Sequence, residues 1–248
     1  MSAGLLAGCG SSDKTEDTTK TEETKTEETS DQEKTATDSS SDSSEVASEE
    51  EGKEAGFSDG SETEDSDSEN ESTGVLLDTS EELTGTHHAE IEVKDYGTIE
   101  VELDADIAPI TVTNFVKLAQ EGFYDGLTFH RIMDGFMIQG GDPNGNGTGG
   151  SDENIKGEFS SNGVENNISH TRGTISMARA NDPDSGSSQF FIVQSDSTFL
   201  DGDYAGFGHV TSGMDIVDQI CKDSKPTDNN GTIPADEQPV IETVKITD

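Results

Sequence analysis

Two neighbouring segments of the chain alternate apolar and polar residues. Residues 89–94 have the sequence AEIEVK and residues 98–103 have TIEVEL, with Gly97 in the short connection between them. Successive side chains of a β-strand point to opposite faces, so a period of two is typical of a strand that is buried on one side. The pattern therefore predicts a hairpin of two half-buried antiparallel strands.

A helical spacing follows this hairpin. Apolar residues recur at intervals of three and four over residues 111–120, with Pro109 before them and Gly122 after them. Proline is favoured at the first position of a helix and glycine just past its end. The segment is therefore predicted to be an amphipathic helix, whose buried face consists of Val112, Phe115, Val116 and Ala119.

The remainder of this half of the chain is predicted to form short elements. Many short strands with Gly-rich connections, and only two helices placed far apart, favour an antiparallel barrel or sandwich over alternating βαβ units. The further strands are predicted at residues 127–133, 136–140, 173–178, 189–194 and 240–246, and the second helix at 214–221.

Charge and aromatic residues divide the chain, whose net charge is −40, into two parts. Residues 10–85 contain 26 acidic residues, five lysines and one aromatic residue, and their net charge is −21. They are predicted to form a disordered acidic Ser/Thr-rich linker, because they cannot bury enough apolar surface to offset the entropy of ordering. Residues 86–248 have a net charge of −19 and 12 of the 13 aromatic residues, which fits one globular domain. Acidity of this size excludes a nucleic-acid binder that works through a basic patch.

The first nine residues resemble the end of a bacterial lipoprotein signal. Residues 6–9 have the sequence LAGC, which is similar to a lipobox, the motif whose cysteine is lipidated after the preceding residues are removed. Residues 1–8 lack the basic region and the longer apolar stretch of a secretory signal, so residues 1–9 are interpreted as a signal remnant and the true start is expected farther upstream. We expect a lipid anchor at Cys9 and an extracytoplasmic location at the cell membrane. If Cys9 is not lipidated, a cytoplasmic protein with an acidic tail is the alternative.

A second hairpin is predicted around an Asp-Gly pair, which is a strong turn signal. The period of two places Phe129, Arg131 and Met133 on one face of the incoming strand. It places Met137 and Gln139 together on the outgoing strand. The hairpin therefore presents an amide, a guanidinium and large apolar side chains.

Another block, residues 187–193, has the sequence SSQFFIV. In a strand, Gln189 and Phe191 share one face, and Phe190 and Ile192 share the other, where we expect Phe190 to be part of the core. An amide and a large apolar side chain again lie on the same side.

These blocks occur in an order that resembles the cyclophilin-type peptidyl-prolyl cis/trans isomerases. The resemblance covers roughly residues 88–247 and implies a mainly β fold, a closed eight-stranded antiparallel β-barrel capped by two α-helices. It implies isomerisation of prolyl bonds without cofactor or metal. The matching segments are NF at 114–115, FHR at 129–131, GFMIQGGD at 135–142, GTGG at 147–150, GTISMA at 173–178, SQFFI at 188–192 and FGHV at 207–210.

The resemblance also implies roles for individual residues. Arg131, Phe136 and Gln139 are the implied catalytic residues, with Gln139 bonding the substrate backbone. A guanidinium that donates to the pyramidal prolyl nitrogen stabilises the twisted amide more than either planar form, and arginine keeps its charge. The implied substrate-binding residues are Met137, Ala178, Arg179, Gln189, Phe191, Phe199, Leu200 and Tyr204.

Three positions depart from many relatives. Phe199 replaces a tryptophan and Tyr204 a histidine, while Arg179 replaces an asparagine of some relatives at a position where the backbone is expected to contact the peptide. Loss of the indole N–H removes a donor but leaves a large apolar wall. We therefore expect near-normal isomerase activity and weakened cyclosporin binding.

Other patterns suggest different chemistry. Residues 142–153 satisfy the spacing of an EF-hand loop, but no helices are predicted to flank it. Adjacent His87 and His88 would point to opposite faces of a strand, and no G-x-S-x-G elbow supports a triad of Ser169, His170 and Asp182. We therefore expect no metal site and no hydrolase activity, and an unreactive buried thiol at Cys221 on the second helix.

The predicted protein is a monomeric prolyl isomerase that assists the folding of exported proteins. Its expected partners are proline-containing peptides and unfolded exported proteins. A proline-peptide binding module or holdase chaperone without catalysis is the alternative. The combination of Arg131, Gln139 and Phe191 favours the enzyme, since binding alone does not need the guanidinium.

Overall fold

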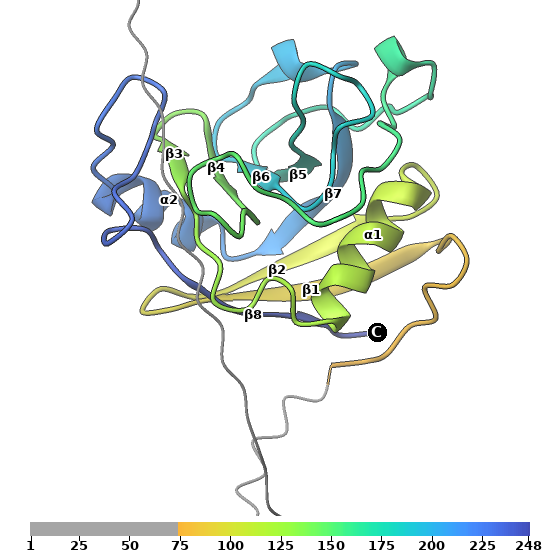
Figure 1. The fold of residues 1–248 in the computed structure, drawn as a ribbon, viewed down its shortest axis with the longest axis horizontal. Coiled ribbons are helices and arrows are strands. Elements are labelled where there is room, and N and C mark those ends of the chain that lie inside the picture. Colours follow the sequence, from red (N-terminus) through yellow and green to blue (C-terminus); the bar gives the residue numbers. More distant parts are fainter. Residues whose placement is uncertain (1–73) are drawn as a thin grey trace, which may run out of the picture. The chain divides into compact units, whose positions relative to one another are not determined.

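The computed structural model describes residues 74–248, so the LAGC motif with Cys9 and the predicted linker up to residue 73 lie outside the described residues. The described part contains eight strands, two α-helices and two short 3-10 helices (Figure 1). In chain order these are β1 (Thr86–Val93), β2 (Gly97–Asp104), α1 (Pro109–Gln120), β3 (Arg131–Met133), β4 (Met137–Gly140), η1 (Ser160–Asn162), β5 (Thr174–Met177), β6 (Phe190–Val193), η2 (Thr198–Leu200), β7 (Ala205–Ser212), α2 (Met214–Asp223) and β8 (Ile241–Ile246).

The predicted hairpin of alternating residues is confirmed as β1 and β2. Ala89 pairs with Val101 and Ile91 pairs with Ile99, so both strands turn their apolar side chains to the same face. These four side chains are at most 1% exposed. The strands are longer than the alternating segments, because residues 86–88 and residues 97 and 104 also pair.

The two predicted helices are confirmed, with Pro109 in the first turn of α1. Phe115 from α1 packs against the rings of Tyr124, Phe190 and Phe207, with centroids 5.1 to 5.5 Å apart. Such aromatic pairs contribute about 0.5–1.5 kcal/mol each beyond the area that they bury. This aromatic cluster is the centre of the core between α1 and the sheet.

All strand pairs are antiparallel, and the strands follow the order β3-β4-β6-β5-β7-β2-β1-β8. The expected closed barrel is not formed by strand pairing, because β3 and β8 at the two ends of this order do not pair with each other. An isolated bridge between Thr128 and Val240 joins the segments beside them. Since β3 has only three residues, it is too short to supply a full closing ladder.

One predicted strand is shorter than expected, and one strand was not predicted. Residues 127–130 are not part of a strand, so the period of two does not extend back from Arg131 to Phe129. Phe129 is fully buried in the main core, 6.1 Å from Phe190 between ring centroids, and does not share a face with Arg131 and Met133. The eight-residue strand β7 has no simple alternation, because glycines occupy two of its buried positions, and the pattern did not reveal it.

Residues 74–85 (orange in Figure 1) lie against the domain, although the predicted linker extends to residue 85. The backbone N–H of Val75 donates to the carbonyl of Ile246 in β8. Leu77 and Leu83 pack on the core, and the N–H of Leu83 donates to Thr113 Oγ1 of α1. We call residues 74–85 the strap. The folded unit therefore begins earlier than the charge pattern indicated.

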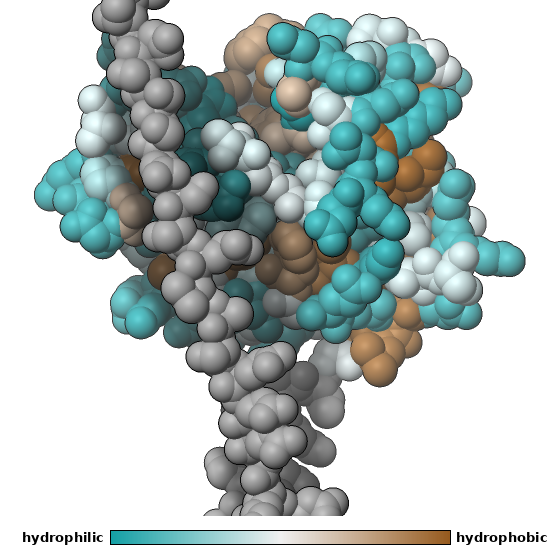
Figure 2. All heavy atoms as spheres, viewed as in Figure 1, coloured by the Kyte–Doolittle hydropathy of each residue, from teal (hydrophilic) through white to brown (hydrophobic). Residues whose placement is uncertain are grey.

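Polar residues (teal) cover much of the domain face seen in Figure 2, with smaller apolar areas (brown) between them. Within residues 74–248, none of the helices has the length and apolar composition needed to cross a membrane.

Candidate active site

Arg131 begins β3 and lies directly opposite Gln139 of β4. Its guanidinium donates from Nε to the carbonyl oxygen of Asn230 at 2.7 Å and from Nη1 to Gln139 Oε1 at 3.1 Å. Two thioether sulfurs complete its surroundings, with Nη2 3.3 Å from Met133 Sδ and Nη1 3.9 Å from Met137 Sδ. Arg131 and Met133 share a face of β3, and Met137 and Gln139 share a face of β4, as predicted for each strand. The pairing of the two strands brings all four side chains to the same side of the hairpin.

The acceptors around Arg131 are all neutral. Among residues 74–248 it forms no salt bridge, whereas Arg172 makes a two-pronged pair with Asp218 at 2.7 and 2.8 Å. Burial lowers the pKa of Arg131, and the nearby Tyr204 and Asp228 oppose this effect. An arginine nevertheless stays protonated in proteins, so the site keeps a positive charge that no carboxylate neutralises.

An apolar hollow of about 190 Å³ lies beside this guanidinium. Met137, Phe191, Val193 and Leu200 form a small apolar cluster that is separate from the main core, and Phe136 and Tyr204 pack against it. The residues that line the hollow are Arg131, Phe136, Met137, Gln139, Ala178, Arg179, Phe191, Leu200 and Tyr204. A ring-sized apolar group can therefore bind next to a fixed cation.

A hydrogen-bonded chain of three side chains lies behind Phe191, which lines the apolar hollow. The imidazole of His170 is fully buried and stacks on Phe191, with centroids 6.0 Å apart and an interplanar angle of 18°. Its Nδ1 lies 2.9 Å from Asp201 Oδ1 and its Nε2 lies 2.9 Å from Ser176 Oγ. Burial lowers the pKa of His170, and the contact with Asp201 opposes this effect only in part. With a neutral imidazole, Nδ1–H donates to Asp201 and Ser176 donates to Nε2.

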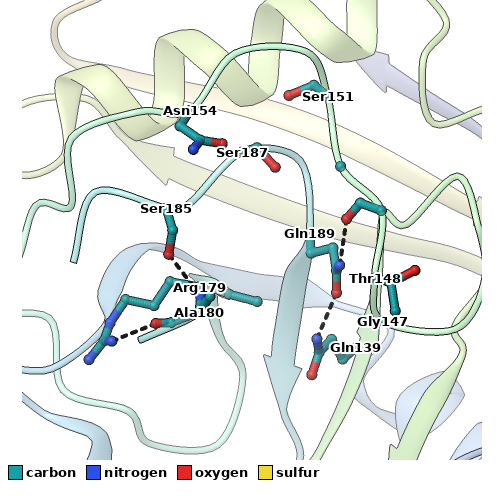
Figure 3. A pocket seen from close by; sticks show the side chains of 13 residues that line it. Gln139, Gly147, Thr148, Ser151, Asn154, Arg179, Ala180, Ser185, Ser187 and Gln189 are labelled. Carbon is teal, nitrogen blue, oxygen red and sulfur yellow. Dashed lines mark hydrogen bonds between the residues drawn. The ribbon is translucent and has the colours of Figure 1, made fainter. Parts of the chain in front are cut away.

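A polar hollow of about 330 Å³ adjoins the apolar one (Figure 3). Gln139 Nε2 donates to Gln189 Oε1 at 2.9 Å, and Gln189 Nε2 donates to the carbonyl of Gly149 at 2.7 Å. Hydroxyl and amide side chains from Thr148, Ser151, Asn154, Ser185 and Ser187 line the rest. The pair Gln139–Gln189 therefore connects the guanidinium to the polar hollow.

Arg179 lies at the border of both hollows, but its guanidinium points away from Gln139 and Gln189 in Figure 3. Its Cζ lies 5.1 Å from the ring centre of Phe159 and 4.8 Å from that of Tyr204. This cation–π contact holds Tyr204, whose ring meets Phe191 edge to face at 5.8 Å. The side chain of Arg179 therefore supports a wall of the apolar hollow.

A family model described as cyclophilin type peptidyl-prolyl cis-trans isomerase/CLD matches residues 88–248. The match covers well over half of the 248 residues, and it contains both hollows. The chain belongs to the cyclophilin-type peptidyl-prolyl cis-trans isomerases. The predicted family and enzyme class are thereby confirmed.

Curated peptidyl-prolyl cis-trans isomerases match this chain over most of their own length. The peptidyl-prolyl cis-trans isomerase of Helicobacter pylori is 47% identical over 142 residues, which are 56% of this chain and 83% of that protein. Peptidyl-prolyl cis-trans isomerase B of Bacillus subtilis is 50% identical over 125 residues, which are 50% of this chain and 84% of that protein.

Solved structures agree with the fold. A cyclophilin type peptidyl-prolyl cis-trans isomerase of Cryptosporidium parvum is similar with a TM-score of 0.59 and 28% identity, over 66% of this chain and 99% of that one. A crystal structure of the same protein in the presence of the dipeptide Ala-Pro gives a TM-score of 0.58 at 29% identity, over 65% of this chain and 99% of that one.

Nine of the eleven residues predicted for the cyclophilin-type site line the apolar hollow. Gln189 lies instead in the polar hollow, where it bonds to Gln139. Phe199 is 72% exposed at the rim, with its ring 5.6 Å from that of Phe136. The structure therefore places the predicted set together, while the individual roles remain predictions.

Sequence reasoning missed the backbone of Asn230, which accepts the Nε–H of Arg131 from far along the chain. Asp228 shapes this turn, since its carboxylate accepts the N–H of Asn230 at 2.9 Å and the N–H of Thr232 at 3.1 Å. Thr232 also forms an isolated bridge to Arg131. The sequence DNNGT at 228–232 is a turn signal, but nothing in it indicates which side chain the turn would meet.

The other patterns have structural explanations. The carboxylate of Asp142 accepts the N–H groups of Asn144, Asn146 and Gly147, so it organises the EF-hand-like loop from within. These bonds lower the pKa of Asp142, although burial alone would raise it. Among residues 74–248, no group of three or more His, Cys, Asp or Glu side chains is placed to hold a metal ion. The carboxylate partner of His170 is Asp201, and not Asp182 as in the triad that the sequence suggested.

Proposed function

We propose that Arg131 catalyses rotation about X–Pro bonds held in the apolar hollow. The observation that carries this proposal is the guanidinium of Arg131, held by neutral acceptors beside a hollow lined by Phe136, Met137, Phe191 and Leu200. Because no carboxylate uses its charge, the guanidinium is available to the substrate.

The proposed mechanism lowers the barrier to rotation about the prolyl amide bond. Rotation breaks amide resonance and costs about 18–20 kcal/mol, so an uncatalysed prolyl bond isomerises in roughly 10–100 s. In the twisted state the prolyl nitrogen regains its lone pair, and an N–H of Arg131 donates to it. The donor interacts more strongly with this state than with either planar form, which is the requirement for catalysis. No covalent bond is made or broken.

Neighbouring residues would hold the peptide on either side of the proline. Gln139 already accepts from Arg131 and donates to Gln189, so it fixes the guanidinium and keeps one N–H for the substrate backbone. The main chain at Ala178 and Arg179 borders both hollows and can pair with an extended peptide. The crystal structure of the Cryptosporidium parvum relative in the presence of Ala-Pro supports a substrate of this chemistry.

A protease-coupled prolyl assay of the full chain tests the role of Arg131. Loss of one preorganised donor costs roughly 10²–10³-fold in rate, so Arg131→Ala should lower kcat/KM by about that factor. Arg172→Gln is the matched control, because Arg172 is paired with Asp218 and lines neither hollow. Equal rates for wild type and Arg131→Ala would overturn the catalytic role and leave a binding module or holdase.

We further propose that the enzyme is anchored through a lipid on Cys9 and assists the folding of exported proteins outside the cytoplasm. The LAGC sequence at residues 6–9 and the acidic stretch that separates it from the domain support this location. Metabolic labelling with palmitate should label the wild type and not Cys9→Ser. Equal absence of label in both, with the protein in the cytoplasm, would contradict the anchor.

A further inference from the structure

The two sulfur atoms beside Arg131 are chemically different from its other acceptors. Met133 Sδ lies 3.3 Å from Nη2 and Met137 Sδ lies 3.9 Å from Nη1. A thioether is a weak hydrogen-bond acceptor, so it contacts the guanidinium without holding its protons firmly. The Nη2 group, whose contact is to Met133, therefore stays available to a reacting prolyl nitrogen. A stronger acceptor at the position of Met133 would change this.

Access of solvent differs between the two methionines. Met137 is 1% exposed, whereas Met133 is half-buried. Of the other methionines in the described part of the chain, Met177 is 4% exposed and Met214 is half-buried. Met214 begins α2 and lines neither hollow. A small oxidant in solution should therefore reach Met133 and Met214 before the buried pair.

The position of the Met133 sulfur is restricted by the turn at Asn230 and Gly231. A Cβ atom added at Gly231 would lie 2.5 Å from Met133 Cγ, so the methionine stem packs closely on this backbone. The same turn holds Nε of Arg131 through the Asn230 carbonyl. An oxygen added to the sulfur would therefore arise beside the guanidinium.

We propose that Met133 is a modification site, at which oxidation by a peroxide lowers isomerase activity by occupying Nη2 of Arg131. The sulfur lone pair attacks one peroxide oxygen, the O–O bond breaks and an S–O bond forms. Sulfur is oxidised by two electrons, and the peroxide is reduced to water. The product is methionine sulfoxide, whose polar oxygen accepts the N–H groups that the thioether contacts only weakly. This inference rests on the proposed role of Arg131.

The experiment uses the full chain treated with hydrogen peroxide for graded times and quenched with excess free methionine. Peptide mass spectrometry gives the sulfoxide fraction at each methionine, and kcat/KM is measured on the same samples. Because a hydrogen bond to a charged donor is the competitor, complete oxidation of Met133 should lower kcat/KM roughly tenfold. Methionine sulfoxide reductase should restore it, and near-UV circular dichroism should remain unchanged.

Two variants separate the site from general damage. After treatment, Met133→Leu should retain the activity that it has when untreated, while Met214→Leu should lose activity as the wild type does. Activity that persists at full oxidation of Met133, or an equal loss in Met133→Leu, would overturn this inference alone. An untreated wild type without isomerase activity would overturn the proposed function, and this inference with it.

Discussion

At the scale of single residues, the three arginines of the domain are held in three different ways. Arg172 is paired with Asp218, and the guanidinium of Arg179 lies over the rings of Phe159 and Tyr204. Arg131 has neutral acceptors on all its bonded nitrogens. Among the described residues Arg179 also lacks a carboxylate partner, because its guanidinium donates to backbone carbonyls. The catalytic role of Arg131 is therefore supported by its place beside the apolar hollow and by its bond to Gln139.

Phe199 gives a prediction about inhibitor binding. Its ring is exposed at the rim against Phe136, and it has no N–H to donate. Replacing it with tryptophan adds one donor to the same apolar wall, and a neutral hydrogen bond contributes about 0.5–1.5 kcal/mol. Phe199→Trp should therefore tighten cyclosporin inhibition by roughly 2–10-fold, measured as Ki in the prolyl assay.

The control for this prediction is Phe199→Leu, which shortens the wall without adding a donor. The Ki of each variant is determined relative to the uninhibited activity of that same variant. Nanomolar inhibition of the wild type, or equal gains in affinity in both variants, would contradict the role assigned to the missing indole N–H.

At the scale of elements, sequence patterns predicted those strands and helices whose formation depends on residues close together in the chain. Alternation revealed β1 and β2 because each is half-buried, and the spacing of apolar residues revealed α1. The site side of the β3–β4 hairpin followed from the same rule. The prediction for Phe129 was wrong because β3 begins only at Arg131, so a period of two does not apply to the residues before it.

The parts of the site that depend on distant segments could not be predicted. The Asn230 carbonyl reaches Arg131 across 99 positions in sequence, and the Asp201 carboxylate reaches His170 across 31. Neither contact has a local pattern, since each joins segments that are far apart in the sequence. The family resemblance identified the side chains of the candidate site, and the structure shows which groups hold those side chains in place.

Glycines in β7 give a matched pair for testing how strands approach each other. A Cβ added at Gly208 would lie 2.1 Å from the backbone oxygen of Glu102 in β2, whereas one at Gly206 would lie 2.8 Å from Ile168 Cγ2. Backbone cannot move without loss of pairing, but a side chain can shift. Gly208→Ala should lower the free energy of unfolding by at least about 1–3 kcal/mol, and Gly206→Ala by less. Urea unfolding measures both, and equal losses would contradict this account.

At the scale of the whole molecule, the apolar and the polar hollow of the candidate site lack the acidic side chains that are common elsewhere in the domain. No Asp or Glu of the described residues lines either of them. If a peptide binds there as proposed, a proline flanked by acidic residues would meet polar neutral groups and the positive charge of Arg131, and no carboxylate of the lining would repel it.

Two buried histidines predict how stability depends on pH. Burial lowers the pKa of His130 and His170 in the folded protein, while the unfolded chain has histidines of ordinary pKa, near 6.5. As the pH falls below about 6.5, the unfolded state takes up protons that the folded state does not, so stability falls. The free energy of unfolding from urea titrations should be lower at pH 5.5 than at pH 7.5.

His170→Gln separates this effect from other titrations. It removes one of the two groups, so the loss of stability between pH 7.5 and pH 5.5 should be smaller than in the wild type. Carboxylates with lowered pKa, such as Asp201, lose their contribution only at more acidic pH. Stability that rises on acidification across this interval would contradict the prediction.

The strap also decides where the protein can be shortened. A version that starts at residue 86, as the charge pattern suggested, would expose the core surface under Leu77 and Leu83 and leave the Ile246 carbonyl and Thr113 without the N–H groups of Val75 and Leu83. A version that starts at residue 74 keeps all four contacts. None of these residues lines the apolar hollow, so poor behaviour of the shorter version would reflect a weakened fold and not a damaged catalyst.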